Sequence, residues 1–190
     1  MPKHKAIILL ASRSPRRKAL LKKAKIPFRI VRSDFKERTF PGAPVKTVIM
    51  NAVGKVKFAR VTLKKGIVLG ADTIVYFKNR IIGKPKTKQE AIQMLARLSG
   101  SCHEVYTGLA LYGLSRKRWK TAYVRSKITM RQFTKREAKH YLSKVNPLDK
   151  AGAYAIQERG DKLVLKIEGS YSNVVGLPVE RLKQLMTYFR

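Results

Sequence analysis

A short apolar run that passes directly into a helix start limits what this chain can fold into more than any other feature. The run is AIILLA (6–11), which has the length and composition of a buried strand, and a Ser-Pro turn follows it. Ser14 fits the N-cap of a helix from Pro15 to about Ala24, because a proline at the first helical position leaves no hydrogen bond unmade. A buried strand followed at once by a capped helix indicates an α/β fold.

Strands and helices continue to alternate after this first unit. Further strands are expected over residues 28–33, 66–71, 73–77, 80–83, 103–113, 119–133 and 162–169. Helices are expected over residues 45–63, 87–100, 134–143 and from 178 onward. This order predicts an α/β fold with a mixed twisted sheet, in two lobes around a deep cleft. Because there is no repeat and no long linker, residues 1–190 are expected to form a single domain.

The charge of the chain is extreme. Lys and Arg number 43 against 11 Asp and Glu, which gives a formal net charge of +32. Such a surface favours polyanion partners, among them nucleic acid, nucleotides and anionic membrane faces. It is equally compatible with a solvated basic surface, natural or engineered, that carries no information about a substrate. The charge alone leaves both interpretations open.

Cysteine usage and hydropathy indicate the cytoplasm. Cys102 is the single cysteine, so the chain can form no internal disulfide, and a reducing compartment is favoured. The apolar run at 6–11 is too short for the core of a signal peptide, and no apolar stretch reaches the ~20 residues that span a bilayer. The sequence therefore predicts a soluble cytoplasmic protein with no membrane partner.

Arg16 and Arg17 occupy the first turn of the first helix, where cations oppose the helix dipole. An anion such as phosphate, held between them, would explain this placement, because free backbone N–H groups attract it to the same point. Chance is the alternative in so basic a chain. Ser12 and Ser14 lack a histidine or aspartate partner for a serine hydrolase, and they fit capping or phosphate contact instead.

The scarce acidic residues carry more information than the basic ones. Asp72 follows the strand expected at 66–71, where ligands bind at the carboxyl ends of strands in α/β sheets. Asp34 and Glu37 follow another expected strand. If these strand ends meet, Glu37 and Asp72 would share a divalent cation with phosphate oxygens, the usual Mg²⁺ arrangement. The alternative is a turn-capping aspartate and a surface glutamate.

Seven stretches, taken together, resemble the Maf family of nucleoside triphosphate pyrophosphatases, historically called septum formation inhibitors. They are SRSPRRKALL, the segment from Asp34 to Glu37, LGADTIV, IIGKP, LSGSCHEVYTG, LDKAGAYAIQ and IEGSYSNVVGLP. Each stretch is a weak signal alone, but all seven follow the family's order and spacing over residues 6–185. SPRR, GADT and YAIQ are similar to the dTTP/UTP pyrophosphatase branch, whereas the 7-methyl-GTP branch carries GSDQ in place of GADT.

The resemblance implies a hydrolase that cuts a nucleoside triphosphate between the α and β phosphates, with Mg²⁺ or Mn²⁺ as cofactor. The implied products are a nucleoside monophosphate and pyrophosphate, and the implied substrates are dTTP, UTP and modified pyrimidine triphosphates. The resemblance also implies an elongated two-lobed fold like that of inosine triphosphate pyrophosphatases, with a homodimer as the expected assembly.

Carried over residue by residue, the resemblance makes Asp72 the proton acceptor that activates water and Glu37 an acid that acts through the metal. From the residues alone, Asp72 as base and Asp72 as metal ligand both stay open. The other implied positions contact the substrate: Arg17, Lys55 and Lys84 at the triphosphate, Arg16, Thr73 and Gln157 in specificity, and Ser12 and Ser14 in the phosphate-binding elbow.

The chain departs from the family in its charge. The helix matching TKREAKHYL carries surface acids in ordinary members, and here it is almost wholly basic. Because Glu37 and Asp72 remain while most other acids are missing, the excess charge is expected on the surface, from a basic proteome or from deliberate supercharging. The alternative function is a basic nucleic-acid-binding or cell-division regulatory protein on the same fold.

Overall fold

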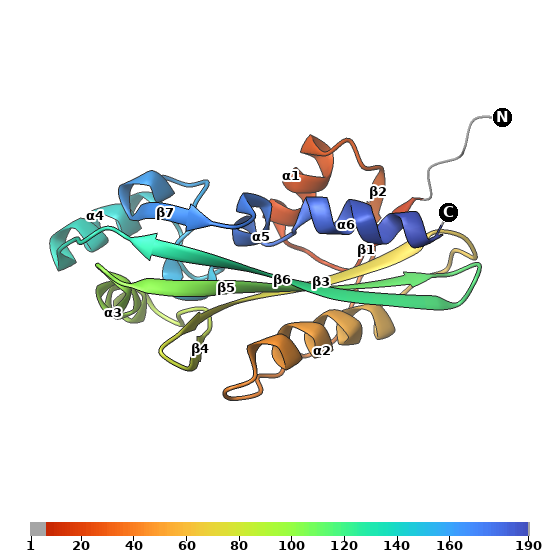
Figure 1. Cartoon of the computed structure of the whole chain (residues 1–190), viewed down its shortest axis with the longest axis horizontal. Helices are drawn as coiled ribbons and strands as arrows, with labels where there is room; N and C mark the ends of the chain where they lie inside the picture. Colours follow the sequence, from red (N-terminus) through yellow and green to blue (C-terminus); the bar gives the residue numbers. More distant parts are fainter. Residues whose placement is uncertain (1–6, 190) are drawn as a thin grey trace.

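The computed structural model describes residues 7–189, along which strands and helices alternate (Figure 1). The described strands are β1 (Ile8–Leu10), β2 (Phe28–Ile30), β3 (Ile67–Phe77), β4 (Arg80–Ile82), β5 (Cys102–Gly113), β6 (Arg118–Met130) and β7 (Val164–Glu168). The α-helices are α1 (Pro15–Lys23), α2 (Pro44–Lys57), α3 (Lys88–Leu98), α4 (Lys135–Lys144), α5 (Tyr171–Val175) and α6 (Val179–Met186). Short 3₁₀ turns cover Ala151–Ala153, Gly160–Lys162 and Thr187–Phe189. No helix within 7–189 has the length and apolar character needed to cross a membrane.

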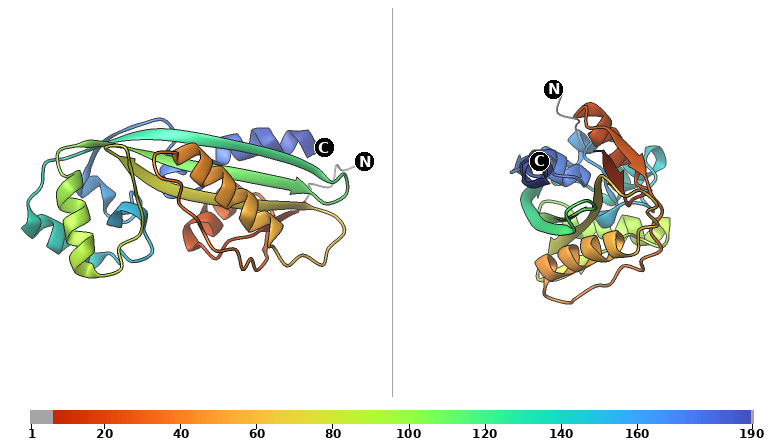
Figure 2. Two further views of the ribbon diagram at one scale, coloured as in Figure 1. Left: turned by 90° about the horizontal axis from the view of Figure 1, so that it is seen from below. Right: turned by 90° about the vertical axis from the view of Figure 1, so that its right-hand side faces the viewer.

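The strands form one mixed sheet in the order β2-β1-β3-β5-β6-β7, with β4 paired to β3. β1 is parallel to both of its neighbours, and the other described pairs are antiparallel. β3, β5 and β6 are the long strands, and they extend along the length of an elongated molecule (Figure 2). α2 lies along one face of these strands, while α1, α5 and α6 lie along the other (Figure 1). The mixed α/β sheet expected from the sequence is confirmed.

Two large cores, one at each end of the sheet, produce the two lobes. The core beside α3 and α4 includes Val75, Leu95, Leu98, Ile128, Leu142 and Tyr154. The core beside α1 and α6 includes Leu10, Leu21, Leu69, Leu109 and Leu182. Because β3 and β5 contribute side chains to both cores, the two lobes share a continuous backbone support.

One strand boundary differs from the sequence prediction in a way that matters for the site. The pattern predicts a strand that ends at Asp72, but β3 continues through this residue to Phe77. Its antiparallel partner β5 is long enough to pair with both halves, and Gly108 lies opposite Asp72. The parallel neighbour β1 stops opposite Leu69. The predicted strand end is therefore wrong, although Asp72 does lie just beyond the parallel part of the sheet.

Two helices also differ from expectation. The stripe over 45–63 predicts a longer helix than α2, which ends at Lys57. Beyond it, Ala59 forms an isolated bridge with Ser33, and the Arg60 backbone N–H donates to the Arg32 carbonyl oxygen. Pairing with the segment after β2 thus replaces the last expected turns. α5 is missing from the prediction because five residues are too few to display a helical period.

α2 packs closely on the sheet because glycines lie beneath it. A Cβ atom at Gly70 of β3 would collide with the Ala52 carbonyl oxygen. One at Gly108 of β5 would collide with the Val48 carbonyl oxygen. Without side chains at these two positions, the helix backbone can approach the strands directly. Lys55, near the end of α2, is thereby brought within reach of the β3 backbone.

Candidate active site

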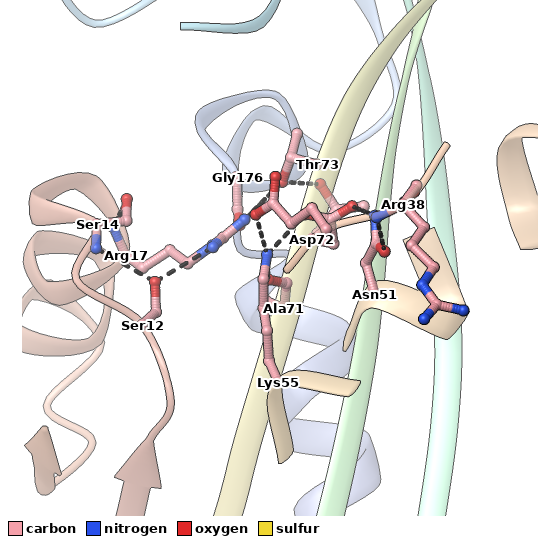
Figure 3. A network of polar contacts seen from close by, with 12 residues as sticks. Ser12, Ser14, Arg17, Arg38, Asn51, Lys55, Ala71, Asp72, Thr73 and Gly176 are labelled. Carbon is pink, nitrogen blue, oxygen red and sulfur yellow. Dashed lines mark hydrogen bonds and ion pairs between the residues drawn. The ribbon is translucent and has the colours of Figure 1, made fainter. Parts of the chain in front are cut away.

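Lys55 joins the two acidic residues that the sequence singles out. Its Nζ lies 2.7 Å from Asp72 Oδ1 and 2.7 Å from Glu37 Oε1. It also donates to the Ala71 carbonyl oxygen at 3.0 Å (Figure 3). The side chains of Lys55 and Asp72 are 11% and 5% exposed, so this ammonium and carboxylate are almost withdrawn from solvent. The expected meeting of Glu37 and Asp72 occurs, and a lysine that looks ordinary in the sequence mediates it.

Asn51 holds the second oxygen of Asp72 and is missing from the sequence prediction. Its Nδ2 donates to Asp72 Oδ2 at 2.8 Å (Figure 3). The same amide donates to the Arg38 carbonyl oxygen and accepts from the Arg38 N–H, both at 2.9 Å. Because Arg38 follows Glu37, Asn51 fixes the loop that carries this glutamate relative to β3. The available signal was a polar residue one turn before Lys55, three positions after a buried valine of the apolar stripe.

Positive charge surrounds the half-exposed Glu37. Burial raises the pKa of its carboxyl, but the charge and hydrogen bond of Lys55 and the charges of Lys84 and Arg17 lower it more, so the pKa lies below the ordinary glutamate value. The group is therefore ionised at neutral pH.

Arg17 connects the phosphate-binding elbow to β3. Its Nε donates to the Gly176 carbonyl oxygen at 2.8 Å, and its two Nη groups donate to Ser12 Oγ and Thr73 Oγ1 at 3.2 and 3.1 Å (Figure 3). Burial lowers the pKa of Arg17, against the raising effect of Asp72, but an arginine stays charged at neutral pH. A partly buried cation is thus held beside the acidic centre.

Ser14 has the capping role expected for it. Its side chain accepts from the Arg17 backbone N–H at 3.4 Å, at the N-cap of α1. The Ser14 backbone N–H in turn donates to Ser12 Oγ. The two serines shape the start of the helix, and Ser12 also orients the Arg17 side chain.

Arg16 has different partners from Arg17. Its Nη1 lies 2.7 Å from Asp149 Oδ2, and its Nη2 donates to the Asp149 carbonyl oxygen at 3.0 Å. The two guanidinium groups therefore serve separate parts of the site. The hypothesis of one anion held between Arg16 and Arg17 has no support in their contacts.

A cavity lies beside this network, where residues of both lobes meet. Of the residues singled out by the sequence, Arg16, Thr73, Lys84 and Gln157 line it. Lys150 and Tyr154 also line it and are missing from the sequence prediction. Val75 and Val105 add apolar surface. A pocket with an apolar wall and a few converging polar groups is the usual form of a small-ligand site.

A family model described as Maf-like protein matches residues 7–189 of the chain. The chain belongs to this family. Curated relatives support the assignment: this Maf-like chain is 44% identical to a dTTP/UTP pyrophosphatase of Bacillus cytotoxicus, over 95% of this chain and 94% of the relative. It is 43% identical to one of Carboxydothermus hydrogenoformans, over 92% and 94%, and 42% identical to one of Dictyoglomus turgidum, over 96% and 95%.

Among solved structures, the Maf-like chain is similar to the Ham1 protein of Staphylococcus aureus. The TM-score is 0.52 at 14% sequence identity, and the match covers 97% of this chain and all of the other. At this identity the likeness concerns the fold alone. It agrees with the elongated two-lobed α/β architecture.

The residues that the resemblance assigns to the Maf-like site fall into two adjoining groups. Contacts or sequence adjacency join Ser12, Arg17, Glu37, Lys55, Asp72 and Thr73. Thr73 belongs to the cavity as well, together with Arg16, Lys84 and Gln157. Ser14 is left at the helix start, and Asp34 lies outside both groups in ion pairs with Arg32 and Arg60.

The acidic residues present suit a cation of the Mg²⁺ type. Within residues 7–189, no group of three or more His, Cys, Asp or Glu side chains is arranged to hold a metal. Glu37 and Asp72 form a pair, because one oxygen of each contacts the same ammonium group of Lys55. Mg²⁺ is commonly bound by one or two carboxylates together with substrate phosphates and water, so a pair fits where a full protein cage is not needed.

Proposed function

We propose that this Maf-like chain is a nucleoside triphosphate pyrophosphatase that hydrolyses dTTP and UTP to the monophosphate and pyrophosphate. The observation that carries the proposal is the Glu37–Lys55–Asp72 centre beside a cavity lined by basic and polar groups. Curated dTTP/UTP pyrophosphatases that are 42–44% identical over nearly the whole chain support the same activity.

Three cations of the site suit a bound triphosphate. The substrate brings about four negative charges, which repel an incoming nucleophile unless they are neutralised. Arg17 and Lys55 lie in the buried network, and Lys84 lines the cavity. We expect Arg17, which has donors left, and Lys84 to bind the phosphate oxygens and to leave the α-phosphorus accessible to water. The donors of Lys55 are used by Ala71, Asp72 and Glu37, so this lysine contributes its positive charge to the site.

Asp72 is suited to act on the attacking water. Lys55 and Asn51 each hold one of its oxygens, so the carboxylate has a fixed orientation. In the proposed reaction the water oxygen forms a bond to the α-phosphorus while the bond from that phosphorus to the bridging oxygen breaks. The carboxylate of Asp72 accepts the proton of the water, and pyrophosphate leaves as an anion.

Glu37 and Asp72 are the residues that would hold Mg²⁺ or Mn²⁺. When bound, such an ion neutralises developing charge on the phosphate oxygens. Glu37 is half exposed and ionised, so it remains available to a cation that arrives with the substrate. We expect activity to disappear on chelation with EDTA and to return on addition of either ion, measured as pyrophosphate released from dTTP.

The test of the proposed function is incubation with dTTP and Mg²⁺, followed by quantification of dTMP and pyrophosphate. We expect both products in equal amounts from the wild type. The alternative, a basic nucleic-acid-binding or cell-division regulatory protein, predicts neither product together with salt-sensitive binding of duplex DNA. Formation of dTDP and inorganic phosphate would exclude cleavage between the α and β phosphates.

The basic surface leads to a secondary proposal about partners. Most lysines and arginines are exposed and outside the site, so we propose weak nonspecific polyanion binding that fades with added salt. We also propose that the protein is located in the cytoplasm and forms a homodimer. Light scattering coupled to size exclusion measures the assembly state directly.

A further inference from the structure

Lys150 is a buried lysine on the wall of the cavity. Its side chain is 5% exposed, and its Nζ donates to the Asn146 carbonyl oxygen and to Asp149 Oδ1, both at 2.8 Å. Glu158 Oε2 lies 3.2 Å away. These contacts account for the three N–H donors of an ammonium group. Lys150 therefore has no donor left for a substrate. Any influence of this lysine on substrate binding is indirect, through the residues that it contacts.

Asp149 links Lys150 to Arg16, which also lines the cavity. While Oδ1 accepts from Lys150, Oδ2 and the backbone carbonyl oxygen accept from the Arg16 guanidinium. Arg16 belongs to α1, whose Leu21 packs in one core, whereas Tyr154, five residues after Asp149, packs in the other. The contact between Arg16 and Asp149 thus joins two residues 133 positions apart, beside the cavity that Arg16 and Lys150 line.

The Asp149 carboxylate is ionised under ordinary conditions. Its burial raises the pKa, but the hydrogen bond from Lys150 and the charge of Arg16 lower it more, so the pKa lies below the usual aspartate value. A charged carboxylate holds a guanidinium in a defined plane when two contacts are made at once. Here the two contacts come from one side-chain oxygen and one backbone oxygen of the same residue.

We propose that Asp149 is a positioning residue that orients Arg16 toward the base of the substrate and so determines the preference for thymine and uracil. Lys150 and Glu158 keep Asp149 in place. The proposal rests on the proposed function, because it concerns substrate choice at the same site.

The chemistry of the base explains the expected preference. A guanidinium has five N–H donors, and Asp149 uses two of those on Arg16. Thymine and uracil present carbonyl oxygens at both C2 and C4, whereas cytosine presents an amino group at C4. A fixed donor that faces this amino group is left without an acceptor, and an unpaired buried donor lowers affinity. A guanidinium free to rotate would lose this discrimination.

The experiment compares kcat/KM for dTTP and dCTP in the full-length protein. We expect Asp149→Ala to lower kcat/KM for dTTP by about tenfold and to change the value for dCTP by less than about twofold. Asp149→Glu, which keeps the charge, should recover part of the lost preference. Should Asp149→Ala fail to fold, as judged by circular dichroism, the near-isosteric Asp149→Asn provides the same comparison.

Asp34→Asn is the matched control. Like Asp149, Asp34 contacts two cationic side chains. Its Oδ1 lies 2.7 Å from a nitrogen of Arg32, and its Oδ2 lies 2.7 Å from a nitrogen of Arg60. These arginines are exposed and line no part of the cavity. The control removes the same kind of ion pair elsewhere, and we expect it to leave the ratio of dTTP to dCTP unchanged.

A double-mutant comparison with Arg16→Ala separates positioning from general damage. If Asp149 acts through Arg16, adding Asp149→Ala to Arg16→Ala changes neither rate further. Equal losses for both substrates, or a full additional loss in the Arg16→Ala background, would overturn the positioning role while leaving the pyrophosphatase intact. A wild type that hydrolyses no triphosphate would instead overturn the proposed function, and the positioning role with it.

Discussion

Lys55 and Lys150 are both buried lysines that contact two carboxylates, yet their surroundings differ. Asp72, one partner of Lys55, is 5% exposed and belongs to the central strand β3. The partners of Lys150, Asp149 and Glu158, are 45% and 38% exposed and lie within eight residues of it. Lys55 therefore neutralises a carboxylate that is almost withdrawn from bulk solvent, whereas Lys150 contacts carboxylates of its own loop that are partly solvated. Similar residue types thus give the proposed catalytic centre in one place and a support in the other.

The largest effect is expected from removing the lysine whose partner is buried. Lys55→Met leaves Asp72 charged and nearly inaccessible to solvent, so we expect a loss of about 3–5 kcal/mol in the free energy of unfolding. Lys150→Met leaves two carboxylates that water can solvate, so its cost should be about 1–2 kcal/mol. Urea denaturation of both variants measures the difference. Equal costs would mean that the exposure of the partner carboxylates does not decide the outcome.

The second prediction concerns catalysis at the Lys55 centre. Asp72→Asn preserves the shape, but its single carbonyl oxygen can accept from Lys55 or from Asn51 and not from both. Because it also removes the proposed proton acceptor, we expect kcat with dTTP to fall by at least about a hundredfold. Asp161→Asn is a suitable control, because Asp161 is 75% exposed and its ion pair with Lys162 is long, at 3.9 Å. Initial rates of pyrophosphate release measure both. A fall of less than tenfold in Asp72→Asn would exclude the role of general base.

His103 is a further buried ionisable group. Unlike Lys55 and Lys150, it contacts no carboxylate among the described residues. His103 is 3% exposed, its Nε2 lies 2.7 Å from the Tyr154 hydroxyl, and its Nδ1 has no partner within 7–189. Burial lowers the pKa of His103 to about 4. Since the folded pKa is below the unfolded one, the neutral ring contributes its full stability above pH ~6.5, and this is lost as pH falls toward 4.

The expected size of this loss is on the order of 2–3 kcal/mol between pH 7 and pH 4. His103→Gln, which carries no titrating ring, should unfold with a flatter pH dependence over the same range. The measurement is the free energy of unfolding in urea at several pH values. Parallel pH profiles for the two proteins would show that His103 is not the group responsible.

The smallest effect is expected at the rim of the cavity. Gln157 lines it through an exposed amide that can both donate to and accept from a pyrimidine edge. Gln157→Ala should change the ratios of kcat/KM among dTTP, UTP and dCTP by a few fold, which corresponds to roughly 1 kcal/mol. We expect little effect on kcat. A uniform loss for all three substrates, with the ranking kept, would assign Gln157 a structural role instead.

Features decided by near neighbours in the chain could be predicted from the sequence. The cap at Ser14 is present as expected, and the helix expected over 134–143 begins with a capping box of Thr134 and Glu137. The strands expected at 73–77 and 80–83 pair as a hairpin, in whose turn Lys78 and Asn79 take φ values of 47° and 59°. Each depends on contacts within about four residues, so the local pattern contains all the information needed.

Features decided by distant partners could be predicted only through resemblance. Asp72 and Glu37 are recognisable by scarcity and family motif, but Lys55 is one of many lysines until α2 places it between them. Asn51 and Lys150 give little local signal, because their partners come from the Glu37 loop, β3 and the segment around residue 149. The continuation of β3 through Asp72 likewise depends on the length of β5.

The sequence by itself therefore determines the class of fold, the starts of the longer helices and the set of acids worth examining. Only the tertiary structure decides which cation meets which acid. The physical reason is that a helix cap needs a partner one turn away, whereas a buried charge is tolerated only where a distant partner reaches it. For Asp72 that partner is Lys55, and for Arg16 it is Asp149.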